Sequence, residues 1–330
     1  MADAGRTAGS VSGRRILVTG GTGFIGSALC RSLVKRGDSV TVATRPGSDR
    51  TRLAGIADSI TIVEADLVDF GQAAALVSRT RPEIVFHLAC SVFNPPGVTA
   101  SGHLDANIGA TAALLEAVRE HPACRLIHTG SAAEYPPGTG LSEEMKPAPV
   151  NVYGAMKACA SLLVDAYARI YGLKTARAVL FTVYGPGEAP HRLVPSTIEA
   201  ALRGQAVRLR DGAVQRDMLF IDDAVDGLLR MGDTDLAPGT ALNLCSGTGL
   251  TVRHIAEEIL RLMDAPFAIE EHKQDGRSDE IRVVSGDNSR ARHLLDWRPH
   301  WSLEAGLGES IAALRAPGTF PAIPTQEIIR

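Results

Sequence analysis

Cysteine is scarce in this chain and is not arranged for pairing or for metal binding. The five cysteines are odd in number, lie far apart and form no C-x-x-C pair: Cys30, Cys90, Cys124, Cys159 and Cys245. This usage excludes a disulfide framework and favours a reducing compartment, which we expect to be the cytoplasm. The nine histidines show no H-E-x-x-H motif or other ligand spacing. We therefore expect no bound metal.

Long apolar runs, a secretory leader and a strong net charge are also missing. The apolar runs are far shorter than the roughly 20 residues of a membrane-spanning helix, so we expect no membrane partner. Residues 1–12 contain no apolar core and predict a disordered lead rather than a signal peptide. The net charge is −3, without the clustered Lys and Arg that bind phosphate backbones, which argues against a nucleic-acid partner.

The first half of the chain alternates short apolar strands with amphipathic helices. Its 330 residues, 45% of them hydrophobic, suffice for about two globular domains. The predicted elements are strand 15–19, helix 24–36, strands 39–44 and 60–64, helix 72–80, strand 84–89, helix 106–120, strand 125–129, helix 153–171 and strand 175–181. This order predicts an α/β fold with a doubly wound parallel sheet, whose ligands bind at the carboxyl ends of its strands.

After Tyr184 the pattern loosens into a smaller, mixed α/β lobe. Its predicted elements are helix 196–203, strands 207–210 and 218–221, helix 222–231, strand 241–245 and helices 252–263 and 303–315. We predict a sheet domain made of 13–179 and 216–246, a second lobe made of 180–215 and 247–316, and a proline-rich surface tail at 317–330.

A glycine-rich segment lies between the first strand and the first helix. Gly20, Gly23 and Gly26 leave room for close backbone approach, and the helix start offers free N–H groups to a phosphate. This placement predicts a dinucleotide site, and a turn whose glycines serve packing alone is the alternative.

The end of the second strand indicates which dinucleotide binds. An acid there would favour the ribose of NAD, but the strand ends at Thr44 and Arg45 without one, so NADP is favoured over NAD. A solvated basic loop is the alternative. Asp66, after the third strand, is a candidate for the adenine or a cap of the next segment.

Tyr153 and Lys157 carry the candidate chemistry. Their four-residue spacing places both on one face of the helix predicted to flank the site. A tyrosine pKa near about 10 is high for work at neutral pH, but a lysine and the positive nicotinamide favour the phenolate. Ser131, at the carboxyl end of strand 125–129, is placed to hydrogen-bond the substrate oxygen. A tyrosine and a lysine that merely share a face remain the alternative.

Taken together, these segments resemble the extended short-chain dehydrogenase/reductase family, in its nucleotide-sugar epimerase, dehydratase and reductase branch. The resemblance runs from Arg14 to about Leu314 and includes TGGTGFIG at 19–26, ADL at 65–67, HLA at 87–89, GSAAEY at 130–135, YGAMK at 153–157, LFTVYGPG at 180–187, RDMLFIDDAVDGLL at 216–229 and GRSDE at 276–280.

The resemblance implies a Rossmann-like fold and roles for further residues. It implies that Ser131, Tyr153 and Lys157 are catalytic and that Asn107 supports the active-site helix or the lysine. It implies a cofactor site that also includes Phe24, Ile25, Thr44, Arg45, Asp66, Leu67, Leu88 and Ala89. It implies a nucleotide-sugar substrate that meets Thr182, Arg216 and Arg277, and a homodimer formed through helices 106–120 and 153–171. Surface ion pairs of Arg216 with Asp217 and of Arg277 with Asp279 are the alternative for the two arginines.

Two residues that depart from the family pattern reduce the number of reactions to consider. Ala132 and Ala133 occupy the positions where sugar 4,6-dehydratases carry acids, so elimination of water is poorly supported. We place first the reduction of the C4 ketone of an NDP-4-keto-6-deoxyhexose, with Tyr153 as proton donor. An NDP-sugar 4-epimerase with tightly bound NAD is the alternative, and a non-catalytic NADP-binding module is the third hypothesis.

Overall fold

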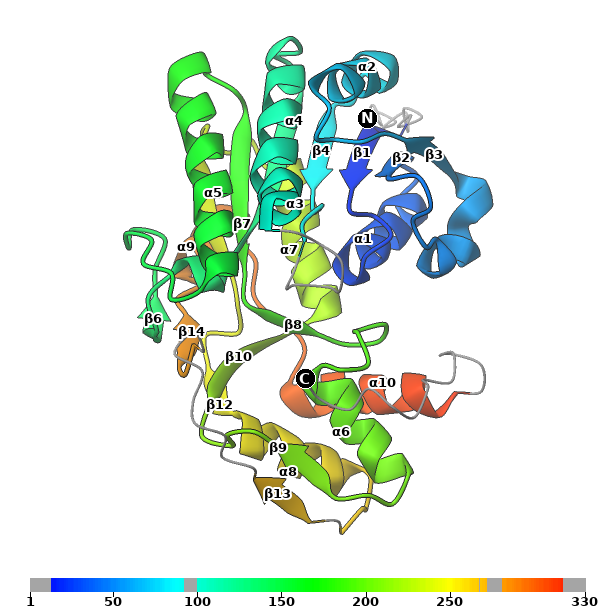
Figure 1. The fold of residues 1–330 in the computed structure, drawn as a ribbon, viewed down its shortest axis with the longest axis vertical. Helices are drawn as coiled ribbons and strands as arrows, with labels where there is room; N and C mark the ends of the chain where they lie inside the picture. Colours follow the sequence, from blue (N-terminus) through cyan, green and yellow to red (C-terminus); the bar gives the residue numbers. More distant parts are fainter. Residues whose placement is uncertain (1–12, 92–99, 267, 272–280, 317–330) are drawn as a thin grey trace, which may run out of the picture.

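The fold is built around a seven-stranded parallel sheet. The computed structural model describes residues 13–91, 100–266, 268–271 and 281–316, and Figure 1 shows their arrangement. The strands are β1 (Arg15–Thr19), β2 (Ser39–Thr44), β3 (Ile60–Glu64), β4 (Ile84–His87), β5 (Arg125–Ser131), β7 (Thr175–Leu180) and β11 (Thr240–Leu244). Their spatial order is β3-β2-β1-β4-β5-β7-β11. Successive connections change direction between β1 and β4, where such sheets bind ligands.

Helices cover both faces of this sheet, so the predicted doubly wound α/β fold is confirmed (Figure 1). Alternate strand residues face opposite ways. One set, including Ile16, Val18 and Phe86, packs with α1 (Phe24–Lys35) and α7 (Ile221–Asp233). The other set, including Leu17, Val85 and Leu126, packs against α2 (Phe70–Thr80), α4 (Ala110–Arg119) and α5 (Val152–Tyr171).

A smaller mixed lobe lies beyond the carboxyl edge of the sheet, in the lower half of Figure 1. It contains the three-stranded sheet β8 (Thr182–Tyr184), β10 (Gln215–Phe220) and β12 (Gly249–Thr251), and the pair β9 (Val207–Leu209) and β13 (Ile269–Glu271). Its helices include α6 (Leu193–Leu202), α8 (Val252–Leu262) and α10 (Leu303–Arg315). Ala201, Leu209, Ala256 and Leu260 form a core between α6, α8 and β9.

Several elements differ from their predicted bounds. The sequence predicted one helix over 106–120. The structure has three successive helical segments in this region: α3 (Ala100–Leu104), a π-helical turn (Asp105–Gly109) and α4, which begins at Ala110. The predicted strand 218–221 is β10, which pairs with β8 and β12 rather than with the seven-stranded sheet. The pair β6 (Gly138–Leu141) and β14 (Val284–Gly286), the helix α9 (Ser289–Leu295) and two 3-10 helices, Thr51–Ser59 and Ala132–Glu134, were not predicted.

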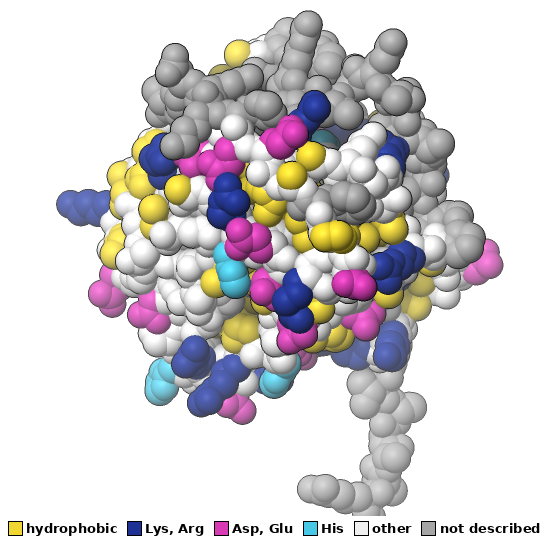
Figure 2. Space-filling view, turned by 90° about the horizontal axis from the view of Figure 1, so that it is seen from below, with side chains coloured by type: hydrophobic (Ala, Val, Ile, Leu, Met, Phe, Trp, Pro, Cys, Tyr) yellow, Lys and Arg dark blue, Asp and Glu magenta, His cyan; other side chains and the backbone are white. Residues whose placement is uncertain are grey.

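The chain ends and the surface complete the description. The predicted lead at 1–12 and tail at 317–330 lie outside the described residues, and the predicted domain boundaries stay a prediction. No helix within the described ranges is long and apolar enough to cross a membrane. On the face of the smaller lobe in Figure 2, acidic and basic side chains are interspersed. Arg261 of α8 pairs with Glu258 of the same helix and with Glu304 of α10.

Candidate active site

The glycine loop folds tightly against the neighbouring strand end. Gly20 has a φ of +71°, and a Cβ added there would lie 2.6 Å from the backbone nitrogen of Ala89. A Cβ on Gly26 would lie 2.1 Å from the carbonyl oxygen of Gly20. Packing within the loop therefore requires glycine at both positions. The loop brings Gly20 together with Leu88 and Ala89.

The start of α1 is open to an anion. Gly23 occupies the N-cap position, and no described side chain caps the helix there. Phe24 and Ile25 form its first turn and are partly buried. The first N–H groups of a helix have no partner within the helix, so this end favours a phosphate.

At the end of β2, Thr44 is buried while Arg45 is exposed. The Thr44 hydroxyl oxygen has no hydrogen-bond partner in the described part of the chain. Arg50, which lies nearby in the sequence, pairs instead with Glu64 of β3. A buried hydroxyl without a partner is uncommon, and it marks a place where a ligand could donate or accept a hydrogen bond.

Asp66 and Leu67 follow β3. The Asp66 carboxylate accepts a hydrogen bond from the Val68 backbone at 3.1 Å, and Leu67 is buried. The side chain that caps α2 is Asp69, which accepts from the Gln72 backbone. Asp66 is therefore not the cap of α2: its side chain caps the turn that directly follows β3, and its contact with the adenine stays a prediction.

Ser131 and Tyr153 come together because two short segments pack closely. Ser131 ends β5 and caps the 3-10 helix Ala132–Glu134. Tyr153 lies in the first turn of α5, where a Cβ on the following Gly154 would lie 2.1 Å from the Ala133 carbonyl oxygen. Only glycine allows that approach. The side chains of Ser131 and Tyr153 are hydrogen-bonded to each other.

The pKa of Tyr153 is raised above its ordinary value, chiefly by burial. The nearby Cys90 thiol raises it further, whereas the hydrogen bond with Ser131 and the charge of Arg192 lower it. The sequence led us to expect the phenolate to be favoured. Among the groups that the structure contains, burial has the larger effect and disfavours the phenolate; the positive nicotinamide of that expectation is not among them.

Lys157 and Asn107 lie behind Tyr153 in the interior. Lys157 is 3% exposed, and its Nζ donates to the Thr129 carbonyl. Asn107 sits in the π-helical turn, where its amide donates to the carbonyls of Ser91 at 3.1 Å and His103 at 2.8 Å and accepts from the Ser91 backbone. Its Nδ2 is also 3.9 Å from the sulfur of Met156 on α5. Asn107 thus joins the end of β4 to the active-site helix.

A model of the NAD dependent epimerase/dehydratase family matches residues 16–245. The chain belongs to this family. This confirms the resemblance drawn from the sequence. Over 319 residues it is 32% identical to a UDP-glucose 4-epimerase of Mycolicibacterium smegmatis, covering 91% of this chain and 98% of that protein.

The chain is also similar to a dehydratase and to a solved structure that contains NAD. A dTDP-glucose 4,6-dehydratase of the same species is 31% identical, covering 92% of this chain and 93% of the relative. The solved structure of MoeE5 in complex with UDP-glucuronic acid and NAD superposes with a TM-score of 0.80 at 27% identity, covering 91% of this chain and 98% of MoeE5. Epimerases and dehydratases of nucleotide sugars are thus both similar to this family member.

Glu134, the acid of the GSAAEY segment, is held by the backbone and by an arginine. Glu134 is buried, and its Oε1 accepts from the Ser131 backbone at 2.7 Å. Its Oε2 lies 3.9 Å from a guanidinium nitrogen of Arg177. Burial raises the pKa of Glu134. Ala132 and Ala133 offer no proton donor, so no carboxyl side chain of this segment is free to meet a substrate.

Thr182 and Arg216 lie on neighbouring strands of the smaller lobe. Thr182 begins β8 and is paired with Met218 of β10. The Arg216 guanidinium donates to the carbonyls of Gln215 at 2.8 Å and Ile281 at 2.7 Å. Arg277 and Asp279 lie outside the described residues.

Asp217 is not the surface partner that the alternative reading of Arg216 requires. It is fully buried and accepts hydrogen bonds from the backbones of Ser246, Gly247 and Gly286 and from the Ser246 hydroxyl. Its carboxylate joins β10 to strand β14 and to the loop after β11, which is a structural role.

Two residues that were not predicted from the sequence, Cys90 and Arg192, lie close enough to Tyr153 to influence its pKa. Cys90 follows the carboxyl end of β4, and Arg192 occupies the N-cap position of α6. The rule that ligands gather beyond strand ends could have indicated Cys90. Arg192 follows an irregular turn, where periodicity gives no signal.

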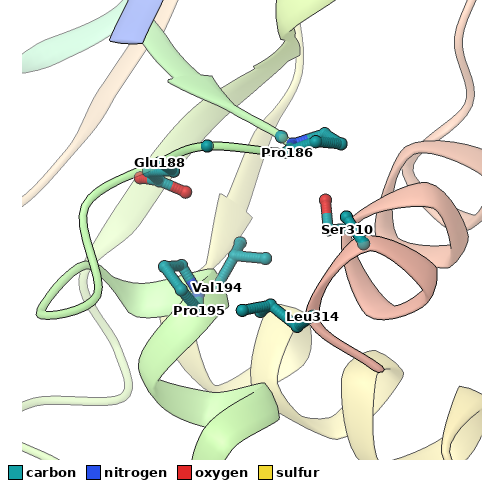
Figure 3. A pocket seen from close by; sticks show the side chains of 9 residues that line it. Pro186, Glu188, Val194, Pro195, Ser310 and Leu314 are labelled. Atoms are coloured by element: carbon teal, nitrogen blue, oxygen red, sulfur yellow. The ribbon is translucent and has the colours of Figure 1, made fainter. Parts of the chain in front are cut away.

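A separate hollow lies between the turn after β8, the start of α6 and the helix α10 (Figure 3). None of the three candidate catalytic residues lines it. Pro186, Val194 and Leu314 give it apolar walls, and Glu188 and Ser310 are polar. Glu188 is 6% exposed, and its Oε2 has no partner within the described residues. Throughout the part of the chain that the structure describes, no group of three or more His, Cys, Asp or Glu side chains could hold a metal ion.

Proposed function

We propose that this chain is a nucleotide-sugar 4-epimerase that works with a nicotinamide dinucleotide. The observation that carries the proposal is the Ser131–Tyr153 hydrogen bond at the carboxyl edge of the sheet, with Lys157 four residues further along α5. The 32% identity to a UDP-glucose 4-epimerase over almost all of that protein supports the choice of reaction.

The residues at the sheet edge fit a dinucleotide. The uncapped start of α1, formed by Gly23, Phe24, Ile25 and Gly26, suits the pyrophosphate, and the buried Thr44 hydroxyl without a described partner suits a ribose. Asp66 and Leu67 would lie at the adenine, Leu88 and Ala89 along the cofactor, and Lys157 at the nicotinamide ribose. When bound, the nicotinamide ring would take up the C4 hydride and return it.

In the proposed mechanism Tyr153 moves the proton and Ser131 holds the oxygen. Tyr153 removes the proton of the C4 hydroxyl, and the Ser131 hydroxyl hydrogen-bonds the same oxygen. The 4-keto sugar then rotates so that the opposite face of its C4 carbonyl meets the nicotinamide. When the hydride has returned to C4, Tyr153 gives the proton back to the C4 oxygen. Burial holds the proton on Tyr153, so the positive charges of Lys157 and of the oxidised cofactor are needed to favour the phenolate.

Elimination of water has less support, although a 4,6-dehydratase is among the relatives. That reaction needs an acid that protonates the departing hydroxyl. Ala132 and Ala133 have none, and Glu134 is held by the Ser131 backbone.

Reduction of an NDP-4-keto-6-deoxyhexose with NADPH is the second candidate. The end of β2 favours it, because Arg45 is exposed and no acid stands at 43–45. From the sequence we predicted this reaction in first place. The relatives named above are epimerases and dehydratases and the family is described as NAD dependent, so we now place epimerisation and NAD first. The non-catalytic module has the least support, because the serine, tyrosine and lysine are all present.

We propose that Thr182 and Arg216 face the nucleotide sugar, with Arg277 as a further contact to its diphosphate. We propose a homodimer formed through α4 and α5, where Leu162 and Ile170 of α5 are exposed.

The proposal is tested by measuring turnover of nucleotide sugars by the native chain and by the variant Tyr153→Phe. The purified chain is incubated with UDP-glucose, UDP-glucuronic acid or dTDP-glucose, with NAD or NADP, and the sugar nucleotides are separated by chromatography. We expect a C4 epimer from at least one substrate, and a loss of about 10² to 10⁴ in kcat for Tyr153→Phe because the proton carrier is removed. Equal activity of the variant would contradict the assigned role.

A further inference from the structure

His87, the last residue of β4, is buried beneath the candidate site and makes hydrogen bonds to two elements. Its Nδ1 lies 2.7 Å from the Thr19 hydroxyl at the end of β1. Its Nε2 lies 3.0 Å from the Thr111 hydroxyl on α4. The side chain therefore spans from the glycine loop to the helix that follows the π-helical turn.

The hydroxyl partners indicate where the imidazole proton lies. Thr111 donates its hydroxyl proton to the Asn107 carbonyl at 2.7 Å, so its oxygen is left to accept a proton from His87 Nε2. The Thr19 oxygen already accepts from the Ala89 backbone at 3.2 Å, which leaves its own proton for His87 Nδ1. Burial, with a smaller contribution from the charge of Lys157, lowers the pKa of His87 to about 3, so the ring is neutral.

The backbone of His87 adds a third connection. The Thr129 hydroxyl donates to the His87 carbonyl at 3.1 Å, and the Thr129 carbonyl accepts from Lys157 Nζ. One residue thus connects the glycine loop, the helix of Asn107 and the strand that holds the lysine.

We propose that His87, as a neutral imidazole protonated on Nε2, is a positioning residue that couples the dinucleotide loop to Asn107 and Lys157. The inference rests on the proposed function. It assigns the two ring nitrogens to different tasks. The Nδ1 contact fixes the end of β1 for the cofactor, and the Nε2 contact fixes the helix that carries Asn107 for turnover.

Two amide substitutions separate the tasks. In His87→Asn the side-chain oxygen can occupy the Nδ1 position and keep the Thr19 contact, while the Thr111 contact is lost. In His87→Gln the amide nitrogen can reach the Nε2 position and keep Thr111, while Thr19 is lost. We expect His87→Asn to lower kcat by about fivefold to tenfold with an unchanged cofactor Kd, and His87→Gln to weaken cofactor binding by a similar factor, the effect of one hydrogen bond.

His128 provides a matched control. Its ring centroid lies 5.4 Å from that of His87, it is buried, and neither of its nitrogens has a hydrogen-bond partner in the described residues. His128→Asn and His128→Gln remove similar bulk without the two contacts, so we expect them to lower stability without the split between kcat and Kd. If the His87 pair behaves like the His128 pair, His87 only packs and the proposal fails.

Two measurements need no turnover and therefore separate this inference from the proposed function. Titration of NAD by calorimetry gives the Kd of each variant, and ¹⁵N NMR of labelled protein, assigned by the signal missing in His87→Asn, reports which ring nitrogen is protonated. We expect protonation on Nε2; a proton on Nδ1, or on both nitrogens, would overturn the proposal. If the His87 variants fold poorly, Thr19→Val and Thr111→Val remove one hydroxyl each, and only Thr19→Val should weaken NAD binding.

Discussion

Glu134, beside the candidate active site, and Glu188, in the separate hollow, are both buried, and burial raises the pKa of each. They differ in how the carboxylate is compensated. Glu134 accepts from the Ser131 backbone and lies near Arg177, whereas Glu188 meets Arg192 at 3.5 Å through one oxygen and has no described partner for the other. Glu188 is therefore the acid whose ionisation most directly opposes folding.

Glu188→Gln should change how stability depends on pH. The pKa of Glu188 is raised from 4.5 to about 7, so the folded chain keeps a proton that the unfolded chain releases within that range. The unfolding free energy of the native chain then falls as pH rises through this window. Relative to the native chain, the variant should gain about 2–3 kcal/mol between about pH 5 and pH 8.

Chemical denaturation at both pH values measures this difference. The matched control is Glu199→Gln on α6, where Glu199 pairs with Arg203. The unfolding free energy of this variant should depend on pH as that of the native chain does. A difference between Glu188→Gln and the native chain that stays constant with pH would mean that Glu188 ionises as it does in the unfolded chain.

At this scale the sequence indicated the residues that stand at strand ends or at helical spacing. Ser131, Tyr153 and Lys157 belong to this group. The hydrogen-bonding of Asp217 and the burial of Glu188 could not be predicted, because their surroundings come from segments distant in the chain, Gly286 for the first and Ser310 for the second.

At the scale of elements, the start of α5 depends on one glycine. A Cβ at Gly154 would overlap the Ala133 carbonyl, so Gly154→Ala should push the first turn of α5 away from the 3-10 helix and separate Tyr153 from Ser131. Such overpacking costs about 1–3 kcal/mol of stability, and we expect kcat to fall by at least about tenfold.

Thermal unfolding and turnover together check this expectation. Gly55→Ala is the matched control, because a Cβ at Gly55 meets nothing within 4 Å and the residue has no positive φ. Retention of full activity by Gly154→Ala would show that the close approach is not needed for the tyrosine and serine to work together.

Elements with clear periodicity were predicted from the sequence, whereas most of the three-residue strands were not; β9 is the exception. The observed bounds of β1, β2, β3 and α10 equal the predicted ones. The strands β8, β12, β13 and β14 have three residues each, too few for an alternating pattern. The π-helical turn at Asp105–Gly109 was also missed, because it depends on the tertiary contacts of Asn107 rather than on propensity.

At the scale of the whole molecule, the order of the sheet sets where the two lobes meet. Strand β10 belongs to the three-stranded sheet, whereas the following α7 and β11 return to the seven-stranded one. The chain therefore crosses between the lobes more than once, which the sequence suggested as interleaving but could not trace. The carboxyl ends of β1, β2 and β4 face this junction, where the dinucleotide is proposed to bind.

Cofactor binding at this junction should stabilise the folded molecule as a whole. At about 100 times its Kd, a ligand that binds only the folded state adds about 2.7 kcal/mol, which corresponds to a Tm increase of roughly 3–4 °C for a chain of this size. We expect equal concentrations of NAD to raise Tm more than NADP. A larger increase with NADP, lost in Arg45→Ala, would favour the reductase instead.

The central claim is that hydride leaves and returns to the same C4 carbon. The most direct measurement incubates the chain and NAD with UDP-glucose carrying deuterium at C4 and follows the sugar by NMR, with reduced nicotinamide monitored by absorbance; another NDP-sugar replaces UDP-glucose if the turnover panel selects it. Epimerisation predicts a C4 epimer that retains the deuterium, with no net change in reduced cofactor. Deuterium accumulating in released NADH together with a 4-keto sugar, or no reaction with any substrate of the panel, would contradict the account.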